Sequence, residues 1–128
     1  MNKQEILKNN YFNIARLESL KTDFRSRIGA VIVRKKRIIA IGRNKPTKTH
    51  PITKKWDIYK TIHAEIDCII GTDRTLLIGS DIYVYRELKD GSIAMARPCD
   101  MCIGELKENG IKKAYYTTIN GIECLKIN

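Results

Sequence analysis

Two short motifs constrain this chain of 128 residues more than any other feature of its sequence. His63-Ala64-Glu65 supplies an imidazole and a carboxylate, and Pro98-Cys99-Asp100-Met101-Cys102 supplies two thiols. One imidazole and two thiolates are three zinc ligands, which leave the fourth tetrahedral position open, as in a catalytic rather than a structural site. We therefore expect a fold that brings the two motifs together around one Zn²⁺ ion.

Both motifs are expected at the start of a helix. Pro98 suits a first helical turn because its missing N–H costs nothing there. Cys99 and Cys102 then share one face of that turn, where unpaired backbone N–H groups favour thiolates. The alternatives for this Cys-x-x-Cys are a redox pair and half of a structural zinc site. A structural site needs a fourth protein ligand, whereas Cys68 and Cys124 each lie in a predicted apolar element and are expected in the core.

Glu65 is expected to act as an acid and base rather than as a ligand. Zinc lowers the pKa of a bound water toward roughly 7, and a carboxylate beside that water can accept its proton and pass it to the substrate. The alternative is a simple helix-start carboxylate that the helix dipole favours. His50, the other histidine, lies in a predicted loop and is expected to contact solvent or substrate rather than zinc.

Size and composition predict a single domain over residues 1–128 with a substantial core, since 43% of the residues are hydrophobic. The sequence contains no run of 18 apolar residues, so a membrane span is not expected. Residues 1–20 show no secretory signal. Two of the four cysteines stand at metal-ligand spacing, so a disulfide framework is not expected and a cytoplasmic location is favoured. An exported toxin domain cut from a longer chain is the alternative.

The net charge of +10 is concentrated in one third of the chain. Residues 21–60 hold thirteen lysines and arginines against Asp23 and Asp57, a net charge of +11. This stretch is either a solvated basic surface or a binding surface for an anionic substrate or a nucleic acid. Part of it interleaves positive charge with rings that can stack on bases: Lys45, Lys48, His50, Lys54, Lys55, Trp56, Tyr59 and Lys60.

The hydrophobic pattern predicts the order α-β-β-α-β-α-β-β. Helices are expected over residues 7–17, 62–70 and 98–108, and strands over 29–33, 38–41, 82–85, 114–117 and 122–127; residues 43–60 and 86–97 are expected as loops. Thr118 to Gly121 alone separate the last two strands. A parallel crossover needs about a dozen residues or more, so this last pair must be antiparallel. The expected fold is α/β, with a mixed five-stranded sheet between helices.

The chain resembles the zinc-dependent cytidine and deoxycytidylate deaminase superfamily, the CMP/dCMP-type deaminases. Beyond the zinc motifs, Ile28–Val33, Gly42-Arg43-Asn44 and residues 111–116 are similar to strands of deoxycytidylate and tRNA adenosine deaminases, so the likeness covers about residues 20–118. It implies a three-layer α/β/α cytidine-deaminase-like fold. It also implies that Asn44 contacts the substrate sugar or base, with a turn asparagine as the alternative, and that the backbone around Ala64 reads the base edge.

Two departures from these relatives matter. The loop before His63 contains no cysteine, so the extra structural zinc segment of many deoxycytidylate deaminases is not expected. The antiparallel last pair of strands is typical of free-cytidine deaminases and of several toxin deaminases, yet free-cytidine deaminases usually carry a cysteine where His63 stands. The chain thus mixes features of two branches.

These features favour a hydrolase that converts cytosine to uracil in a small pyrimidine nucleoside or nucleotide, with dCMP or CMP preferred. Arg43 and Lys45 are the first candidates for holding a 5′-phosphate. The alternative is the same chemistry on cytosine, or with less support adenine, in single-stranded DNA or RNA. A non-catalytic zinc or nucleic-acid-binding module is a third reading, but it has no use for Glu65. The relatives are often oligomeric, so a homo-oligomer is expected.

Overall fold

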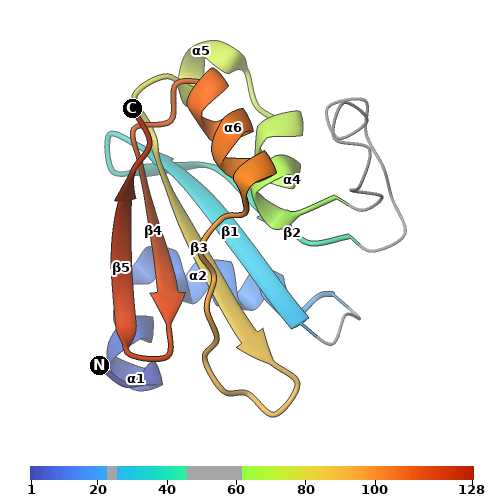
Figure 1. The fold of residues 1–128 in the computed structure, drawn as a ribbon, viewed down its shortest axis with the longest axis vertical. Helices are drawn as coiled ribbons and strands as arrows, with labels where there is room; N and C mark the ends of the chain where they lie inside the picture. The colour runs from blue at the N-terminus through green and yellow to red at the C-terminus, as the bar shows by residue number, and fades with distance from the viewer. Residues whose placement is uncertain (23–25, 46–61) are drawn as a thin grey trace.

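The computed structural model describes residues 1–22, 26–45 and 62–128. In this part of the chain, five strands form one mixed sheet in the order β2-β1-β3-β4-β5 (Figure 1). The strands are β1 (Ser26–Arg34), β2 (Arg37–Arg43), β3 (Asp81–Leu88), β4 (Lys113–Thr118) and β5 (Gly121–Lys126). β3 and β4 are parallel, while β1 pairs antiparallel with both β2 and β3, and β4 pairs antiparallel with β5. The predicted mixed sheet with an antiparallel last pair is confirmed.

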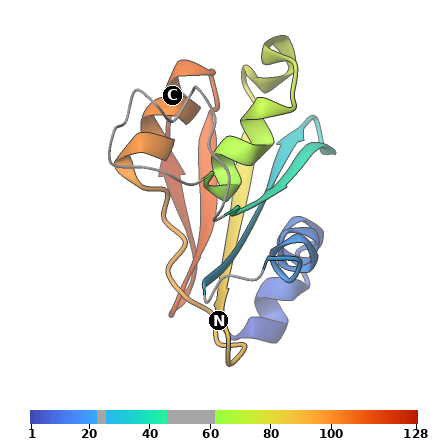
Figure 2. The same cartoon turned by 90° about the vertical axis from the view of Figure 1, so that its right-hand side faces the viewer.

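Helices cover both faces of this sheet. α1 (Lys3–Leu7) and α2 (Asn10–Ser19) lie on one face, and α4 (Ala64–Ile70) and α6 (Asp100–Glu108) lie on the other (Figures 1 and 2). The short helix α5 (Arg74–Leu77) connects α4 to β3. This arrangement is the predicted three-layer α/β/α fold. No helix in the described ranges is both long and apolar enough to span a bilayer.

Alternating side chains of β3 separate two apolar layers. Ile82 and Val84 are buried in the cluster beneath α4 and α6, whereas Tyr83 and Tyr85 pack in the cluster beneath α1 and α2. Successive residues of a strand point to opposite faces, so a strand with apolar residues at every position must be covered on both sides. The central strands therefore hold the helices that carry the two motifs.

The first hairpin forms as predicted, although its turn lacks glycine and asparagine. Lys35 and Lys36 link β1 to β2, and their φ angles of 49° and 67° lie in the left-handed region. Positive φ at both central residues is the geometry of a two-residue type I′ turn, whose twist matches that of the flanking strands. Favourable strand pairing therefore holds these two lysines in a conformation that L residues seldom adopt.

The helices differ from the prediction in three respects. The helix expected over residues 7–17 forms as α2 but begins only at Asn10, because Asn9 caps it: the side-chain oxygen of Asn9 accepts hydrogen bonds from the backbone N–H groups of Tyr11 and Phe12. α1, which ends at Leu7, is a separate helix that was not predicted. The predicted helix face is also wrong at Leu17, which is 53% exposed, while Phe12 and Ala15 are buried. α5 was not predicted, since four residues show no helical period.

Three further predictions need correction or fall outside the described residues. Cys124 is exposed, not buried, because β5 is the last strand of the sheet and its middle residues face outward. β3 runs to Leu88, beyond the expected end at residue 85. Of the expected loop at 43–60, Arg43 closes β2, and residues 46–60, with His50 and Trp56, lie outside the described ranges.

Candidate metal centre and active site

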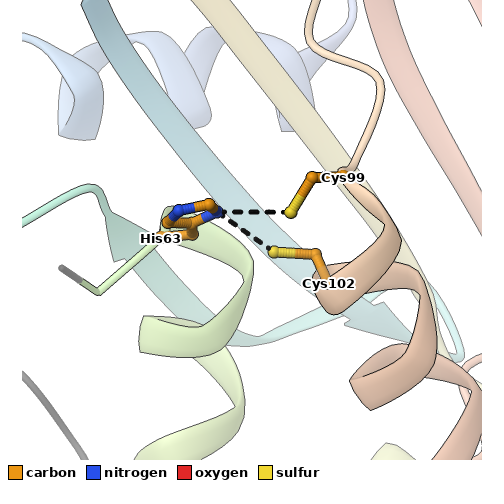
Figure 3. A group of neighbouring side chains, drawn as sticks. All are labelled: His63, Cys99 and Cys102. Atoms are coloured by element: carbon orange, nitrogen blue, oxygen red, sulfur yellow. Dashed lines mark hydrogen bonds between the residues drawn. The ribbon is translucent and has the colours of Figure 1, made fainter. Parts of the chain in front are cut away.

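The two motifs meet where the N-termini of α4 and α6 face each other. His63 is the N-cap residue of α4, and Cys99 is the N-cap residue of α6 with Cys102 one turn later. Figure 3 shows the imidazole of His63 pointing at both sulfur atoms. The predicted convergence of His63, Cys99 and Cys102 is therefore present in the fold.

The donor atoms are spaced as zinc requires. Nδ1 of His63 lies 3.6 Å from Sγ of Cys99 and 3.4 Å from Sγ of Cys102, and the three donor atoms lie within 4.8 Å of one another. A tetrahedral zinc with the usual Zn–N and Zn–S bond lengths separates its nitrogen and sulfur ligands by about 3.6 Å. The cluster thus fits a Zn²⁺ ion. Cys102 is buried, whereas His63 and Cys99 are partly exposed.

The two thiols differ strongly in acidity. The hydrogen bond from Cys102, with help from His63, lowers the pKa of Cys99 to about 3 against the opposing effect of burial. The pKa of Cys102 is raised, first by the same hydrogen bond and then by burial. Cys99 is therefore the readier thiolate, and a bound cation would be needed to deprotonate Cys102 as well, as metal ions do to thiol ligands.

Glu65 lies in the first turn of α4, beside this cluster, and is 5% exposed. Burial raises its pKa, while its interactions with His63 and Cys102 act in the opposite direction. A carboxyl group with a raised pKa exchanges protons more readily near neutral pH than an ordinary glutamate does. The position and environment of Glu65 thus suit the predicted acid and base.

A network at the end of β2 fixes the start of α4. Lys45 and Ile62 exchange two backbone hydrogen bonds of 2.8 and 3.1 Å directly before His63. Asp67 of α4 accepts a 2.7 Å hydrogen bond from Nζ of Lys45 and a 3.1 Å bond from the backbone N–H of Arg43. Because Asp67 lies one turn after His63, these contacts tie the metal-binding end of the helix to the sheet.

The sequence analysis did not single out Asp67. Its partners Arg43 and Lys45 lie more than 20 residues away in the chain, and no short-range pattern links them. An acidic residue in the first turn of a helix is explained by the helix dipole alone. Only the tertiary contact of Arg43 and Lys45 with the start of α4 reveals the function of Asp67 in the fold.

The remaining predicted site residues have partners of their own. Asn44 is buried: its side-chain oxygen accepts a hydrogen bond from the N–H of Ile28, and its Nδ2 donates to the carbonyl of Ser26. The guanidinium of Arg43 donates a 2.6 Å hydrogen bond to Glu18. Ala64 is fully buried at the first position of α4. The substrate-binding roles of Asn44, Ala64, Arg43 and Lys45 stay predictions.

Comparison with known families decides the identity of the domain. A family model described as "Cytidine and deoxycytidylate deaminase zinc-binding region" matches residues 2–118. The chain belongs to this family. It is therefore a zinc-type deaminase, a hydrolase, and the reading as a non-catalytic module is set aside. The predicted zinc cofactor agrees both with the family and with the cluster of His63, Cys99 and Cys102.

Solved structures share the fold at low sequence identity. The dCMP deaminase of cyanophage S-TIM5 without ligand is 24% identical, with a TM-score of 0.61 over 92% of this chain and 86% of that chain. The same enzyme in complex with dCMP and dUMP is 22% identical, with a TM-score of 0.61 over 92% of this chain and 84% of that chain. A cytidine deaminase from Mycobacterium leprae is 17% identical, with a TM-score of 0.50 over 97% of this chain and 93% of that chain. No curated protein matches the chain in sequence.

Proposed function

We propose that this deaminase converts cytosine to uracil in a small pyrimidine nucleotide, with dCMP or CMP preferred over the nucleoside. The observation that carries the proposal is the cluster of three zinc-ligand atoms beside the buried carboxylate of Glu65. Further support comes from the cyanophage enzyme, which shares the fold and binds dCMP and dUMP. The high positive charge of the chain favours an anionic substrate over a neutral nucleoside.

The protein groups divide the work of the reaction. His63, Cys99 and Cys102 hold the zinc ion, which when bound activates a water molecule for attack on the C4 carbon of the base. Glu65 accepts one proton from this water and delivers it to the ring nitrogen. It then accepts the second proton, from the hydroxyl group added at C4, and passes it to the leaving amino group as the C4 carbonyl forms. Water is thus consumed, ammonia leaves and uracil remains. Burial raises the pKa of Glu65, and a carboxyl group with a raised pKa suits a role in which it both accepts and donates protons.

The basic residues beside the start of α4 are the candidates for a contact with the 5′-phosphate. Arg43 and Lys45 lie beside the start of α4 in space, but each already pairs with a carboxylate, Glu18 or Asp67. A phosphate with nearly two negative charges competes well against a carboxylate with one. We therefore keep Arg43 and Lys45 as the residues that bind the 5′-phosphate, while Asn44 and the backbone of Ala64 contact the nucleoside.

A cytoplasmic homo-oligomer remains our prediction for the protein in the cell.

Replacing Glu65 by glutamine tests the chemistry. The variant should keep its zinc, because Glu65 is not a ligand, while the turnover rate should fall by about 10²–10⁴-fold or more, since general acid–base groups contribute this much and Glu65 serves several proton transfers. Zinc content is measured by elemental analysis and turnover by uracil formation. A variant that keeps more than a tenth of the wild-type rate would remove Glu65 from this role.

A single substrate panel tests the substrate class. Cytidine, deoxycytidine, CMP, dCMP and cytosine-containing single-stranded DNA and RNA oligonucleotides are assayed for uracil at low and high salt. Faster turnover of CMP or dCMP than of the matching nucleoside is expected. Turnover of the oligonucleotides alone, falling steeply with salt as counterion release requires, would instead establish the polynucleotide as substrate. Equal rates on nucleotide and nucleoside would show that no basic residue reads the phosphate.

A further inference from the structure

Four consecutive cationic residues form the β1–β2 turn, which we call the basic turn: Arg34, Lys35, Lys36 and Arg37. Arg34 is partly buried, and the other three are exposed. Among the described residues, none of the four takes part in an ion pair, whereas the cations next to the active site and the first helices do. The basic turn thus concentrates four positive charges that the described part of the fold does not neutralise.

The backbone conformation of the basic turn is unfavourable for lysine. Lys35 and Lys36 occupy the two left-handed positions of the turn, where a residue with a Cβ costs about 1–2 kcal/mol. Asn-Gly is the pair that this turn type favours. Lysine at both positions therefore stabilises the turn less than Asn-Gly would. What the two lysines add in return is their positively charged side chains.

A groove runs beside the basic turn. It has a volume of about 460 Å³ and is lined by Arg34, Lys35, Arg37, Ile39 and Leu76. Nη1 of Arg34 donates a 3.2 Å hydrogen bond to the carbonyl of Thr75, which fixes the guanidinium against α5. Leu76 on α5 is 41% exposed. The groove therefore combines three cationic side chains with two aliphatic ones.

The acidic residue at the start of α5, Asp73, is not among the residues that line the groove. Asp73 is the N-cap of α5, and its side chain accepts hydrogen bonds from the backbone N–H and the hydroxyl of Thr75. It thereby serves the helix start. A row of cations beside an aliphatic floor matches a chain of phosphates whose sugars or bases rest on apolar side chains.

We propose that the basic turn and α5 bind the phosphate backbone of a single-stranded nucleic acid. The surface is separate from the catalytic centre, because Arg34 pairs with Arg37 at one end of the β1–β2 ladder while Arg43 lies at the other end, next to α4. Figure 2 shows the β1–β2 turn on the far side of α4 from α6. The proposal goes beyond the proposed function and does not depend on which substrate the active site accepts.

The test exploits the opposite effects that one double substitution should have on stability and on binding. Lys35→Asn with Lys36→Gly installs the favoured turn pair, so the melting temperature should rise. Binding of oligothymidylate, which contains no cytosine to deaminate, should weaken. Each phosphate contact on a single strand contributes about 0.7 to the slope of log K against log salt, so the slope should fall by about 1.4 and the affinity by about 25-fold at 0.1 M salt. Fluorescence anisotropy of the full zinc-loaded chain over a salt series measures both.

Two further variants make the result specific. Lys107→Gln with Lys112→Gln removes the same charge from two exposed lysines elsewhere and should leave the slope unchanged. Leu76→Asp places a negative charge in the groove and should weaken binding without touching the turn. If the Lys35/Lys36 and Lys107/Lys112 double variants lost the same affinity for oligothymidylate, binding would depend on net charge alone and the proposal would be overturned. A stabilised turn variant with unchanged binding, or binding to phosphatidylserine vesicles without binding to oligothymidylate, would overturn it as well.

Discussion

His63 and Cys99 occupy the N-cap positions of α4 and α6, yet neither side chain makes a capping hydrogen bond. Serine, threonine, asparagine or aspartate at an N-cap stabilises a helix by about 0.5–2 kcal/mol through such a bond. The chain forgoes this stabilisation at both helices and instead directs the two side chains at each other, 3.6 Å apart. Residues placed against local stability in this way are expected where function decides the choice.

Substitution of the four cysteines should separate ligands from bystanders. Cys99→Ala and Cys102→Ala should reduce the zinc content from about one ion per chain to nearly none, because each removes one of three protein ligands. Cys68→Ala and Cys124→Ala should keep the ion, since Cys68 is buried against the carbonyl of Ala30 and Cys124 is exposed on β5. Elemental analysis of the purified variants measures the outcome. Zinc loss in the Cys68 or Cys124 variant would contradict the three-ligand site.

Glu87 should make the stability of the fold depend on pH. Burial opposes its ionisation, but hydrogen bonds from Tyr85 and Lys3 and the charges of Lys3 and Arg16 outweigh burial, so the pKa of Glu87 is lowered. A lowered folded-state pKa contributes stability above the unfolded-state value of about 4.3, and that contribution is lost as the pH falls through the folded-state pKa. Glu87→Gln should therefore destabilise the protein at pH 7 by about 1 kcal/mol, a modest value because both cations are partly exposed.

Urea unfolding at pH 7 and pH 3 checks this expectation. The difference between wild type and Glu87→Gln should shrink as the pH falls from 7 to 3, because the wild-type carboxylate takes up its proton as the pH falls through its lowered folded-state pKa. Glu123→Gln is the control, because Glu123 is an exposed carboxylate in the middle of β5, and its substitution should change stability little at either pH. A difference for Glu87→Gln that is the same at both pH values would show that packing, rather than charge, is what the substitution removes.

The positions of the candidate site residues were predictable to the extent that they depend on local sequence. The three candidate ligands stand in motifs whose spacing predicts that they meet, and the fold brings them together beside Glu65; their roles stay predictions. The exposure of Cys124 depends on β5 being the outer strand of the sheet, which no local pattern reveals. The hydrogen bonds of Asn44 to β1 likewise depend on a tertiary contact.

At the scale of elements, Gly42 controls how closely α4 approaches β2. A Cβ atom at this position would lie 2.6 Å from the carbonyl oxygen of Ala64 and 2.8 Å from the backbone nitrogen of Cys68. Both contacts are with backbone, so Gly42→Ala must displace α4 together with His63. The variant should melt at a lower temperature and bind zinc less tightly than wild type.

Gly71 offers the matched control for this prediction. It ends α4 with a negative φ, and an added Cβ would meet nothing within 4 Å. Gly71→Ala should therefore leave both the melting temperature and zinc affinity close to wild type. Calorimetry and competitive zinc titration of the two variants compare them directly. Unchanged zinc affinity in Gly42→Ala would mean that the position of the metal-binding end of α4 does not depend on the close packing of α4 against β2.

The elements themselves were largely predictable because they are long enough to show a period. The β1–β2 hairpin, α4, α6 and the last two strands all lie within a few residues of their expected bounds. The break between α1 and α2 depends on one capping side chain, Asn9, and α5 is a single turn, so neither leaves a periodic signal. The extension of β3 to Leu88 follows from its pairing with β1 along eight residues, a contact that strand propensity alone does not reveal.

At the scale of the whole molecule, the short connection between β4 and β5 determines how these two strands pair at the edge of the sheet. Too few residues connect β4 and β5 for a crossover helix, and the antiparallel pairing of Tyr115 with Cys124 and Thr117 with Ile122 confirms the expected arrangement. The position of β1 between β2 and β3 could not be derived in the same way. It depends on which faces the helices cover, and thus on the packing of the complete chain.

The complete molecule should be markedly more stable with zinc than without it. The ligands come from the N-termini of α4 and α6, whose dipoles both direct positive charge at the same point and so repel each other until thiolates and the metal bridge them. An ion that binds the folded state only adds about 4.1 kcal/mol at a free concentration 1,000 times its dissociation constant. For a chain of this size, that corresponds to a rise in melting temperature of more than about 10 °C. Calorimetry of chelator-treated and zinc-loaded protein measures the rise. Glu65→Gln should show the same rise and Cys99→Ala none, whereas an equal melting temperature with and without zinc in the wild type would contradict a metal that joins the two helices.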